Sequence, residues 1–425
     1  MGLVAVPFRS FVLVSREQIA RNYRNVRSVV GAGVEVLGVV KADAYGHGAI
    51  EVARVLAGEG ARWLAVSSVD EGATLRAAGR AIVAVVKGDA YGHGAIEVAR
   101  VLVGEGARWL AVSSVDEGAT LRAAGVTAPR ILVMGGYLPF EEAALIEHDL
   151  TPAVHSLAQM RDLDRLATAA GKPVRYHLKI DSGMGRLGTR APAAEIVAAL
   201  AATGHAQLEG LMTHFASAAD YTSTQTADQL ACFERVADAI ERAGYRGLRL
   251  HTSSTNAIAY GRANSGYNLV RAGHALYGYV SPARGEAPAQ RLDVRPALTW
   301  KARLLAVKDL PEGALVGYGG TFRTPRAMRI GVLGAGYADG IFHRLSNRGQ
   351  VIAGGKLTPI LGTISMDLTT IDLSHSSALG PGDEVTLLGQ EGDARLDAQQ
   401  IARVAGTISY NILCSISARV RRVYV

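Results

Sequence analysis

Lys41 and Lys87 carry the clearest chemical signature in this chain. Each follows a short apolar run and opens the same text, Lys-x-Asp-Ala-Tyr-Gly-His-Gly. A lysine at the end of a buried strand is partly desolvated, which lowers its pKa and makes the amine nucleophilic. Such an amine can form a Schiff base with a carbonyl compound. The alternative is an ordinary solvated lysine at the rim of the fold.

The two lysines occupy equivalent positions in a tandem repeat. Residues 39–79 return as residues 85–125 with two differences, one of which places Gly88 where the first copy has Ala42. Glycine loosens a strand end, so Gly88 favours the first lysine. The second copy, however, is the one that continues directly into the remaining chain. The residues by themselves leave both lysines open as the reactive group.

Further polar residues stand at the ends of other apolar runs. His214 ends the run LMTH, Arg271 lies in NLVRAG, and Arg186 lies in the glycine-rich text KIDSGMGRLG. Each could be an ordinary loop residue. Together, at separate strand ends, they would form a positively charged opening that can bind anions. Thr255 and the backbone around Gly273 offer donors for a phosphate, as the later loops of α/β barrels often do.

The surrounding sequence predicts the elements that position these residues. From about residue 15 to 280, β-rich apolar runs alternate with amphipathic helical segments, which is typical of a parallel sheet. When one copy of the repeat is counted, the runs match a (β/α)8 barrel. We expect one copy to lie outside the barrel, as an insertion, a swapped element or a poorly ordered segment. A ten-stranded barrel is not expected, because strand number, tilt and shear are linked.

The alternation of strand-like and helical segments ends near residue 291. Short alternating strands follow and predict a mainly β domain. The predicted domains are a barrel over residues 11–290, including both copies of the repeat, and a β domain over residues 291–425 joined by the extreme N-terminus. With 425 residues, two domains are the default expectation.

Composition excludes several classes of function. The net charge is +7, but lysine and arginine are spread along the chain, so we expect small anions rather than nucleic acid as partners. Cys232 and Cys414 make neither a disulfide framework nor a metal-binding pattern, and we expect no metal. We see no secretory signal and no apolar run that could span a bilayer, which predicts a cytoplasmic protein without a membrane partner.

Eight motifs occur in one order along the chain: VVKADAYGHG, LKIDSGMGRLG, MTHFASAA, RAGHALYGY, GYGGTF, GYADG, SMD and ISYNILCSIS. In this order the chain resembles the alanine racemase family over nearly its whole length. The resemblance implies a pyridoxal 5′-phosphate enzyme whose barrel is followed by a β domain. One departure is Ser254-Thr255, where the family usually has Asn-Ser; threonine can still donate to a phosphate.

The resemblance implies that Lys41 or Lys87 holds the cofactor covalently. Arg271 would face the pyridine nitrogen, with His214 hydrogen-bonded beside it. Because an arginine stays protonated, it would donate to an unprotonated ring nitrogen, which weakens the ring as an electron sink and suppresses side reactions. The implied contacts of the phosphate are Tyr45 or Tyr91, Thr255, the backbone of Gly273 and His274, and Tyr410.

Racemisation needs an acid and a base on opposite faces of Cα. By the resemblance the lysine serves one face, and Tyr318 serves the other from a partner subunit. Arg186 would bind the substrate carboxylate, and Lys179 matches a lysine that is carbamylated in many family members and orients this arginine. The implied lining of the substrate pocket comprises Met366, Asp367 and Tyr337.

The resemblance therefore implies a homodimer with a shared active site that interconverts L-alanine and D-alanine and supplies D-alanine for peptidoglycan. One alternative is a racemase of broader or serine preference. Another is a non-catalytic barrel protein that binds the cofactor and has been inactivated by the duplication. Related carrier proteins lack the β domain, so Tyr318 and residues 291–425 argue against that class.

Overall fold

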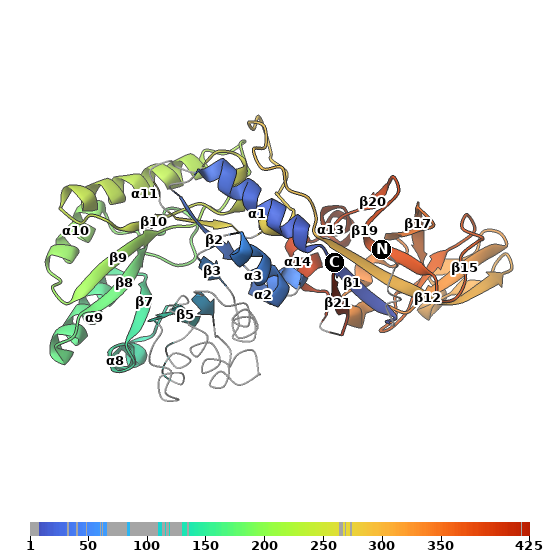
Figure 1. The fold of residues 1–425 in the computed structure, drawn as a ribbon, viewed down its shortest axis with the longest axis horizontal. Helices are drawn as coiled ribbons and strands as arrows, with labels where there is room; N and C mark the ends of the chain where they lie inside the picture. The colour runs from blue at the N-terminus through green and yellow to red at the C-terminus, as the bar shows by residue number, and fades with distance from the viewer. Residues whose placement is uncertain are drawn as a thin grey trace. The chain divides into compact units, whose positions relative to one another are not determined.

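The computed structural model describes residues 8–31, 34–39, 41–47, 49–59, 61, 63–65, 83–85, 109–112, 115, 119, 130–133, 136–262, 267, 269–272, 274–417 and 419–425. The chain divides into two compact units, which are coloured along the chain in Figure 1. The β unit comprises residues 1–18, 45–48 and 296–425, and the barrel unit comprises residues 19–44 and 49–295.

The barrel unit contains a parallel sheet of ten strands in the order β10-β9-β8-β7-β6-β5-β4-β3-β2-β11. Arg271 N–H donates to Ser253 O at 2.9 Å, and a parallel bridge joins Ser254 to Arg271, so the two ends of this sheet, β10 and β11, also meet. The described strands therefore close into a ring. Their bounds are β2 (Glu35–Val39), β3 (Trp63–Ala65), β4 (Val83–Val85), β5 (Trp109–Val112), β6 (Arg130–Val133), β7 (Leu150–Val154), β8 (Val174–Lys179), β9 (Ala206–Met212), β10 (Arg249–His251) and β11 (Leu269–Ala272).

The predicted class, an α/β barrel followed by a β-rich region, is confirmed. The predicted eight strands and the placement of the repeat are wrong, because the described sheet has ten strands, an arrangement that we did not expect. We expected one copy outside the barrel. Instead β2 and β3 flank the first copy's motif, β4 and β5 flank the second copy's motif, and β4 and β5 pair between β3 and β6. Both copies offer apolar strands whose backbone N–H and C=O groups need partners. The sheet supplies those partners to all four strands.

Amphipathic helices cover the strands of the barrel unit. In α9 (Leu157–Ala170), Met160, Leu163 and Ala167 are buried on one face. The hydroxyl of Ser156 caps this helix by accepting from Gln159 N–H at 3.1 Å. Figure 1 shows α9, α10 and α11 alongside β8, β9 and β10. The helices of this unit are α1 (Arg16–Val30), α3 (Ala49–Gly58), α8 (Glu142–Glu147), α9, α10 (Ala193–Ala201), α11 (Gln225–Arg242) and the short α12 (Thr255–Ala259).

The β unit is built on a nine-stranded sheet in the order β20-β19-β16-β17-β18-β15-β12-β1-β21. The long strand β12 alternates, with Leu298, Trp300, Ala302 and Leu304 facing the core. The N-terminal strand β1 (Ser10–Val14) pairs with β12 and with β21, so it belongs to this unit. The other elements are β12 (Leu298–Leu310), β13 (Leu315–Val316), β14 (Phe322–Arg323), β15 (Met328–Leu333), β16 (Gln350–Ala353), β17 (Lys356–Leu361), β18 (Thr369–Asp372), β19 (Glu384–Glu391), β20 (Ala394–Leu396), α13 (Ala398–Ala405), α14 (Ser409–Cys414) and β21 (Arg421–Tyr424).

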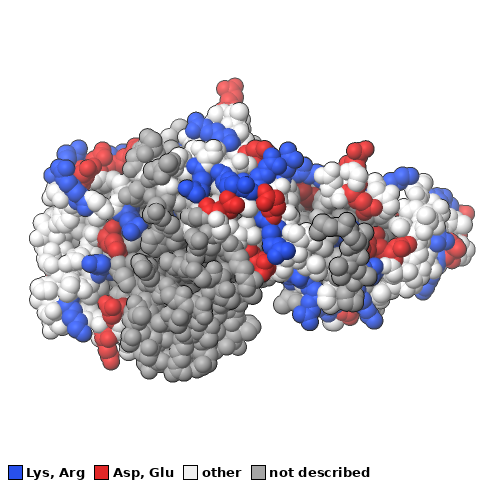
Figure 2. All heavy atoms as spheres, viewed as in Figure 1, with Lys and Arg blue, Asp and Glu red and all other residues white. Residues whose placement is uncertain are grey.

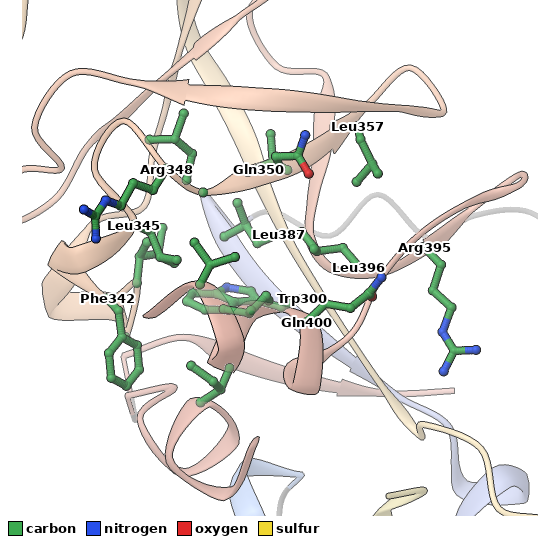
Figure 3. A pocket seen from close by; sticks show the side chains of 18 residues that line it. Trp300, Phe342, Leu345, Arg348, Gln350, Leu357, Leu387, Arg395, Leu396 and Gln400 are labelled. Carbon is green, nitrogen blue, oxygen red and sulfur yellow. The ribbon is translucent and has the colours of Figure 1, made fainter. Parts of the chain in front are cut away.

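A cavity of about 120 Å³ lies inside the β unit. Figure 3 shows Trp300, Leu345 and Leu387 around it, whereas Arg348 and Arg395 extend away from it. Its lining is dominated by apolar side chains, which suit packing rather than catalysis.

Charges of both signs are interspersed over the face shown in Figure 2. Among the helices that the structure describes, none combines the length and the apolar character needed to cross a membrane.

Candidate active site

Arg271 organises the carboxyl end of the barrel sheet from β11. Its Nη1 donates to the carbonyl oxygen of His251 at 2.7 Å and to Nδ1 of the same residue at 3.0 Å. Its Nη2 donates to Thr213 O at 2.7 Å, to Thr252 O at 3.1 Å and to His214 Nδ1 at 3.2 Å. Five acceptors thus hold one guanidinium in place.

The guanidinium of Arg271 stays charged in this setting. Burial lowers its pKa to about 10, which still leaves it protonated at neutral pH. Both Nη atoms are occupied, and within the described residues Nε–H is the guanidinium donor that has no acceptor. The site therefore presents one oriented donor that a neutral aromatic nitrogen can accept.

Next to Arg271 lies a row of polar side chains, of which His251 and His177 are buried and Glu209 is half-buried. His251 Nε2 is 3.4 Å from His177 Nδ1, and the two rings meet edge to face. His177 Nε2 is 3.6 Å from the carboxylate of Glu209. Burial, followed by the charge of Arg271, lowers the pKa of His251 well below its usual range. The row thus runs from a guanidinium through two imidazoles to a carboxylate.

Lys179, at the end of β8, is almost fully buried, with 9 % of its surface exposed. Its pKa is lowered, first by burial and then by the charges of Arg186 and Arg271. Arg186 itself is exposed, in the loop that follows β8. Asp181 stiffens this loop by accepting from Gly183 N–H at 3.2 Å, Gly185 N–H at 2.9 Å and Arg190 Nε at 2.8 Å.

His155, just beyond β7, was not predicted from the sequence. Burial, followed by the charge of Lys179, lowers its pKa to about 4. Both ring nitrogens are buried, and no hydrogen-bond partner for either occurs among the described residues. Gly136 packs on this ring, because a Cβ at that position would lie 2.9 Å from Cδ2 of His155. An uncharged imidazole thus lies within the electrostatic reach of the buried lysine.

Thr255 and His274, two of the predicted phosphate-binding residues of the barrel unit, are buried. Thr255 opens α12, and its hydroxyl accepts from Ala275 N–H at 3.1 Å. His274 stacks on Tyr279 with ring centroids 5.1 Å apart. Gly273, Lys87 and Tyr91 lie outside the described residues. Lys41 begins α2 (Lys41–Gly46), which follows β2.

Tyr45 and Gly46 of the first copy, at the end of α2, pack within the β unit. The Tyr45 ring lies 5.9 Å from that of Tyr410, whose pKa is raised by burial. Arg422 donates through Nε to Gly46 O at 3.1 Å. Gly46 approaches Leu413 so closely that a Cβ would lie 2.5 Å from its carbonyl oxygen. Contacts from β21 and α14 therefore hold the end of α2 in place.

The predicted pocket residues of the β unit lie on exposed turns. Tyr318 is 75 % exposed, Met366 is 53 % exposed and Tyr337 is 45 % exposed. Tyr337 N–H donates to Ser365 O at 3.0 Å, which ties the turn of Tyr337 to the loop of Met366 and Asp367.

Arg419 joins the turn of Tyr337 and the loop of Asp367 through its side chain. It contacts Asp339 at 2.6 and 3.1 Å and Asp367 at 2.6 Å. Asp339 is almost fully buried and also accepts from Gly336 N–H at 2.8 Å. Arg419 was missed because its partners lie far away in the sequence.

The sequence held a signal for some of the other missed residues. His177 stands two positions before Lys179, so both side chains lie on one face of β8. His251 ends a short strand-like run in the same way as His214 does. Glu209 carries no such signal, since an isolated glutamate in a strand is usually exposed.

A parallel barrel with buried arginine and lysine at its strand ends, together with a β unit, defines a two-domain enzyme of the α/β-barrel class. The family model described as "Alanine racemase, N-terminal domain" matches twice, over residues 14–81 and 77–282. The model described as "Alanine racemase, C-terminal domain" matches residues 297–424. Each copy of the repeat falls within its own match to the N-terminal model.

Relatives and solved structures agree with these matches. The alanine racemase of Halothermothrix orenii is 40 % identical, over 95 % of this chain and 93 % of that protein. The structure of the Bacillus anthracis alanine racemase with bound L-Ala-P has a TM-score of 0.70 and 28 % identity, covering 99 % of this chain and 96 % of that one. The alanine racemase of Bartonella henselae, with covalently bound pyridoxal phosphate, has a TM-score of 0.73 at 24 % identity, covering 99 % of this chain and 100 % of that one.

The chain belongs to the alanine racemase family. Members of this family are isomerases that depend on pyridoxal phosphate.

Proposed function

We propose that this chain interconverts L-alanine and D-alanine with pyridoxal 5′-phosphate, and supplies D-alanine for peptidoglycan. The observation that carries the proposal is the setting of Arg271. The guanidinium is charged, both Nη atoms are held by protein acceptors, and Nε–H remains for a ligand. That donor fits the unprotonated ring nitrogen of the cofactor, which when bound stabilises negative charge at the substrate Cα.

We propose Lys41 rather than Lys87 as the lysine that holds the cofactor. Tyr45 and Gly46, from the same motif as Lys41, occupy the contacts that Tyr410, Leu413 and Arg422 offer. Tyr45 adopts a φ of 54°, a left-handed conformation that is unfavourable for a non-glycine residue. Such a strained conformation persists only where its surroundings hold it. This supports a specific position for the Tyr45 motif of the first copy.

The remaining roles follow the family motifs. Tyr318 and the lysine would move the proton on opposite faces of Cα. Arg186 would bind the substrate carboxylate, and His214 would fix Arg271 from the side. The phosphate would be held by Tyr45, Thr255, the backbone of Gly273 and His274, and Tyr410.

Lys179 is proposed to carry a carbamate. Its lowered pKa favours the neutral amine, which can bond to carbon dioxide and lose a proton. The described residues place no carboxylate at ion-pair distance from Lys179, so the carbamate would supply the anion that orients Arg186.

A second copy of this chain is proposed to complete the pocket in a cytoplasmic homodimer. Tyr318, Met366 and Tyr337 expose large apolar surfaces in the β unit, as do Leu315 at 58 % and Leu368 at 40 %. Exposed apolar groups of this kind mark interaction surfaces. Met366, Asp367 and Tyr337 would then line the entrance to the partner's pocket.

The duplication offers matched pairs of variants that test this proposal. Lys41→Ala and Lys87→Ala make the same change in either copy, as do Gly46→Ala and Gly92→Ala. We expect Lys41→Ala to abolish both D-alanine formation and the visible band of lysine-bound pyridoxal phosphate. Lys87→Ala should retain both.

Gly46→Ala should weaken cofactor binding, because the new Cβ meets Leu413 O at 2.5 Å, whereas Gly92→Ala should not. Loss of the band in Lys87→Ala alone would assign the second copy instead. A wild-type protein that forms the band but racemises serine faster than alanine would overturn the proposed substrate. No band in the wild type would overturn the enzyme itself.

A further inference from the structure

The row of side chains behind Arg271 has a definite order of donors and acceptors. Every guanidinium hydrogen is a donor, and Arg271 has no acceptor. His251 Nδ1, which lies 3.0 Å from Nη1, must therefore be an unprotonated acceptor. The proton of a neutral His251 ring then sits on Nε2.

The same logic extends to the next ring. His251 Nε2–H faces His177 Nδ1 at 3.4 Å, so this nitrogen of His177 must accept. The proton of His177 is thereby placed on Nε2. That atom lies 3.6 Å from the carboxylate of Glu209, which is an acceptor only.

We propose that Arg271 fixes the protons of this row, so that His251 and His177 are both neutral Nε2–H tautomers directed at Glu209, and that Glu209 is a positioning residue for Arg271. The carboxylate of Glu209 lies 3.6 Å from Nε2 of His177, on the side of the row away from Arg271. His214 takes the same tautomer on the other side of Arg271, because its Nδ1 accepts from Nη2 at 3.2 Å.

Charging either imidazole would break this order. A second proton on His251 would point at the guanidinium, where two donors would face each other. Burial lowers the pKa of His251, and the positive charges of Arg271 and Arg249 lower it further. A second proton on His177 would face the Nε2–H of His251. The row therefore has one arrangement of protons that satisfies every contact.

The backbone makes room for this row at Gly210. A Cβ there would lie 2.8 Å from Nδ1 of His177 and 2.9 Å from its Cε1. The residue next to Glu209 must therefore be small for His177 to reach His251. This independent feature of β9 fits a row whose geometry is specified rather than incidental.

The function of the row is to hold the guanidinium of Arg271 in one orientation. With both Nη atoms tied to acceptors, Nε–H is left for the cofactor. This consequence rests on the proposed function, whereas the tautomers themselves do not require any bound cofactor. A failure of the predicted tautomers can thus be distinguished from a failure of the proposed function.

The first test is a two-bond ¹H–¹⁵N correlation spectrum of the cofactor-free protein labelled with [¹⁵N]histidine. Single His→Gln variants assign the signals of His251, His177 and His214. We expect the pattern of a neutral ring with its proton on Nε2 for all three at about pH 8. The lowered pKa of His251 should keep its pattern unchanged down to about pH 6. An Nδ1–H tautomer or a charged ring at His251 or His177 would overturn the inference.

The second test concerns Glu209 and measures the affinity for pyridoxal phosphate by absorbance titration. Glu209→Leu removes the acceptor, and we expect about a tenfold or greater loss of affinity, as for other residues that orient a ligand-binding group. Glu209→Gln retains an acceptor and should lose less. Glu195→Leu makes the same change at an exposed position of α10 and serves as the control.

Wild-type affinity in Glu209→Leu would refute the positioning role, even if the spectrum shows the expected tautomers. If the tautomers are as expected but the wild-type protein does not bind the cofactor, the proposed function fails and the proton order stands.

Discussion

Replacing His155 with phenylalanine should change how the stability of the protein depends on pH. The folded protein holds the pKa of His155 at about 4, whereas the unfolded value is 6.5. The unfolded chain therefore binds more protons between these values, and stability rises with pH across that window. The stabilisation is present above pH 6.5 and is lost as the pH falls toward 4.

The size of the effect follows from the shift. A difference of about 2.5 units corresponds to about 3.4 kcal/mol once the pH is below both values. Between pH 7.5 and 5, about 2 kcal/mol of this is lost. Since His155 is partly accessible, solvent screening reduces the expected loss to about 1 kcal/mol.

The assay is equilibrium unfolding in urea at pH 7.5 and 5, with wild type, His155→Phe and His375→Phe. The last variant changes an exposed histidine of the β unit and is the control. We expect the free energy of unfolding to fall less on acidification in His155→Phe than in wild type. Equal pH dependence in all three proteins would refute the reasoning.

A direct titration of the His155 ring by NMR measures its pKa and tests how the charge of Lys179 affects that pKa. Because the charge of Lys179 contributes to the lowered pKa, a carbamate on Lys179 would reverse the sign of that contribution. The pKa of His155 should therefore be higher in bicarbonate than in buffer depleted of carbon dioxide. An unchanged pKa would contradict the proposed carbamate.

Three further substitutions probe the packing. Gly210→Ala should lower the free energy of unfolding by about 1–3 kcal/mol because the new Cβ meets His177 at 2.8 Å; an unchanged urea midpoint would contradict the close packing. Val351→Ile adds one methylene beside the cavity of about 120 Å³ and should raise the free energy of unfolding by about 0.8 kcal/mol, whereas a lower midpoint would mean that the side chain does not enter it. Arg419→Met should raise KM for alanine more than it lowers kcat, because the turn of Asp339 and the loop of Met366 lose their common partner; equal effects on both constants in steady-state racemisation would argue against a role at the entrance.

Much of the fold could be predicted because its signals are local. Apolar periodicity within ten to twenty residues identified helices such as α9 and α11, and alternation identified β12. The barrel class followed from the alternation of those elements, and Arg271 could be placed at a strand end by the same reasoning. The roles assigned to Arg271, Lys179 and Tyr318 remain predictions.

The placement of the repeat could not be predicted, because two nearly identical texts carry identical local preferences. Pairing between strands decides where β4 and β5 lie, and that depends on partners from β3 and β6. The position of Gly46 likewise depends on the hydrogen bond from Arg422, which lies near Gly46 only in the folded chain.

Short runs of neighbouring residues were enough to indicate the family, the alternation of strands and helices, and the strand ends that carry polar residues, since each of these signals is local. Tertiary structure alone decided that Glu209, His177 and His251 form one row behind Arg271, and that His155 lies uncharged near Lys179. The physical reason is that burial and the charge of neighbouring groups set the protonation of a side chain, and both arise only when distant strands pack together.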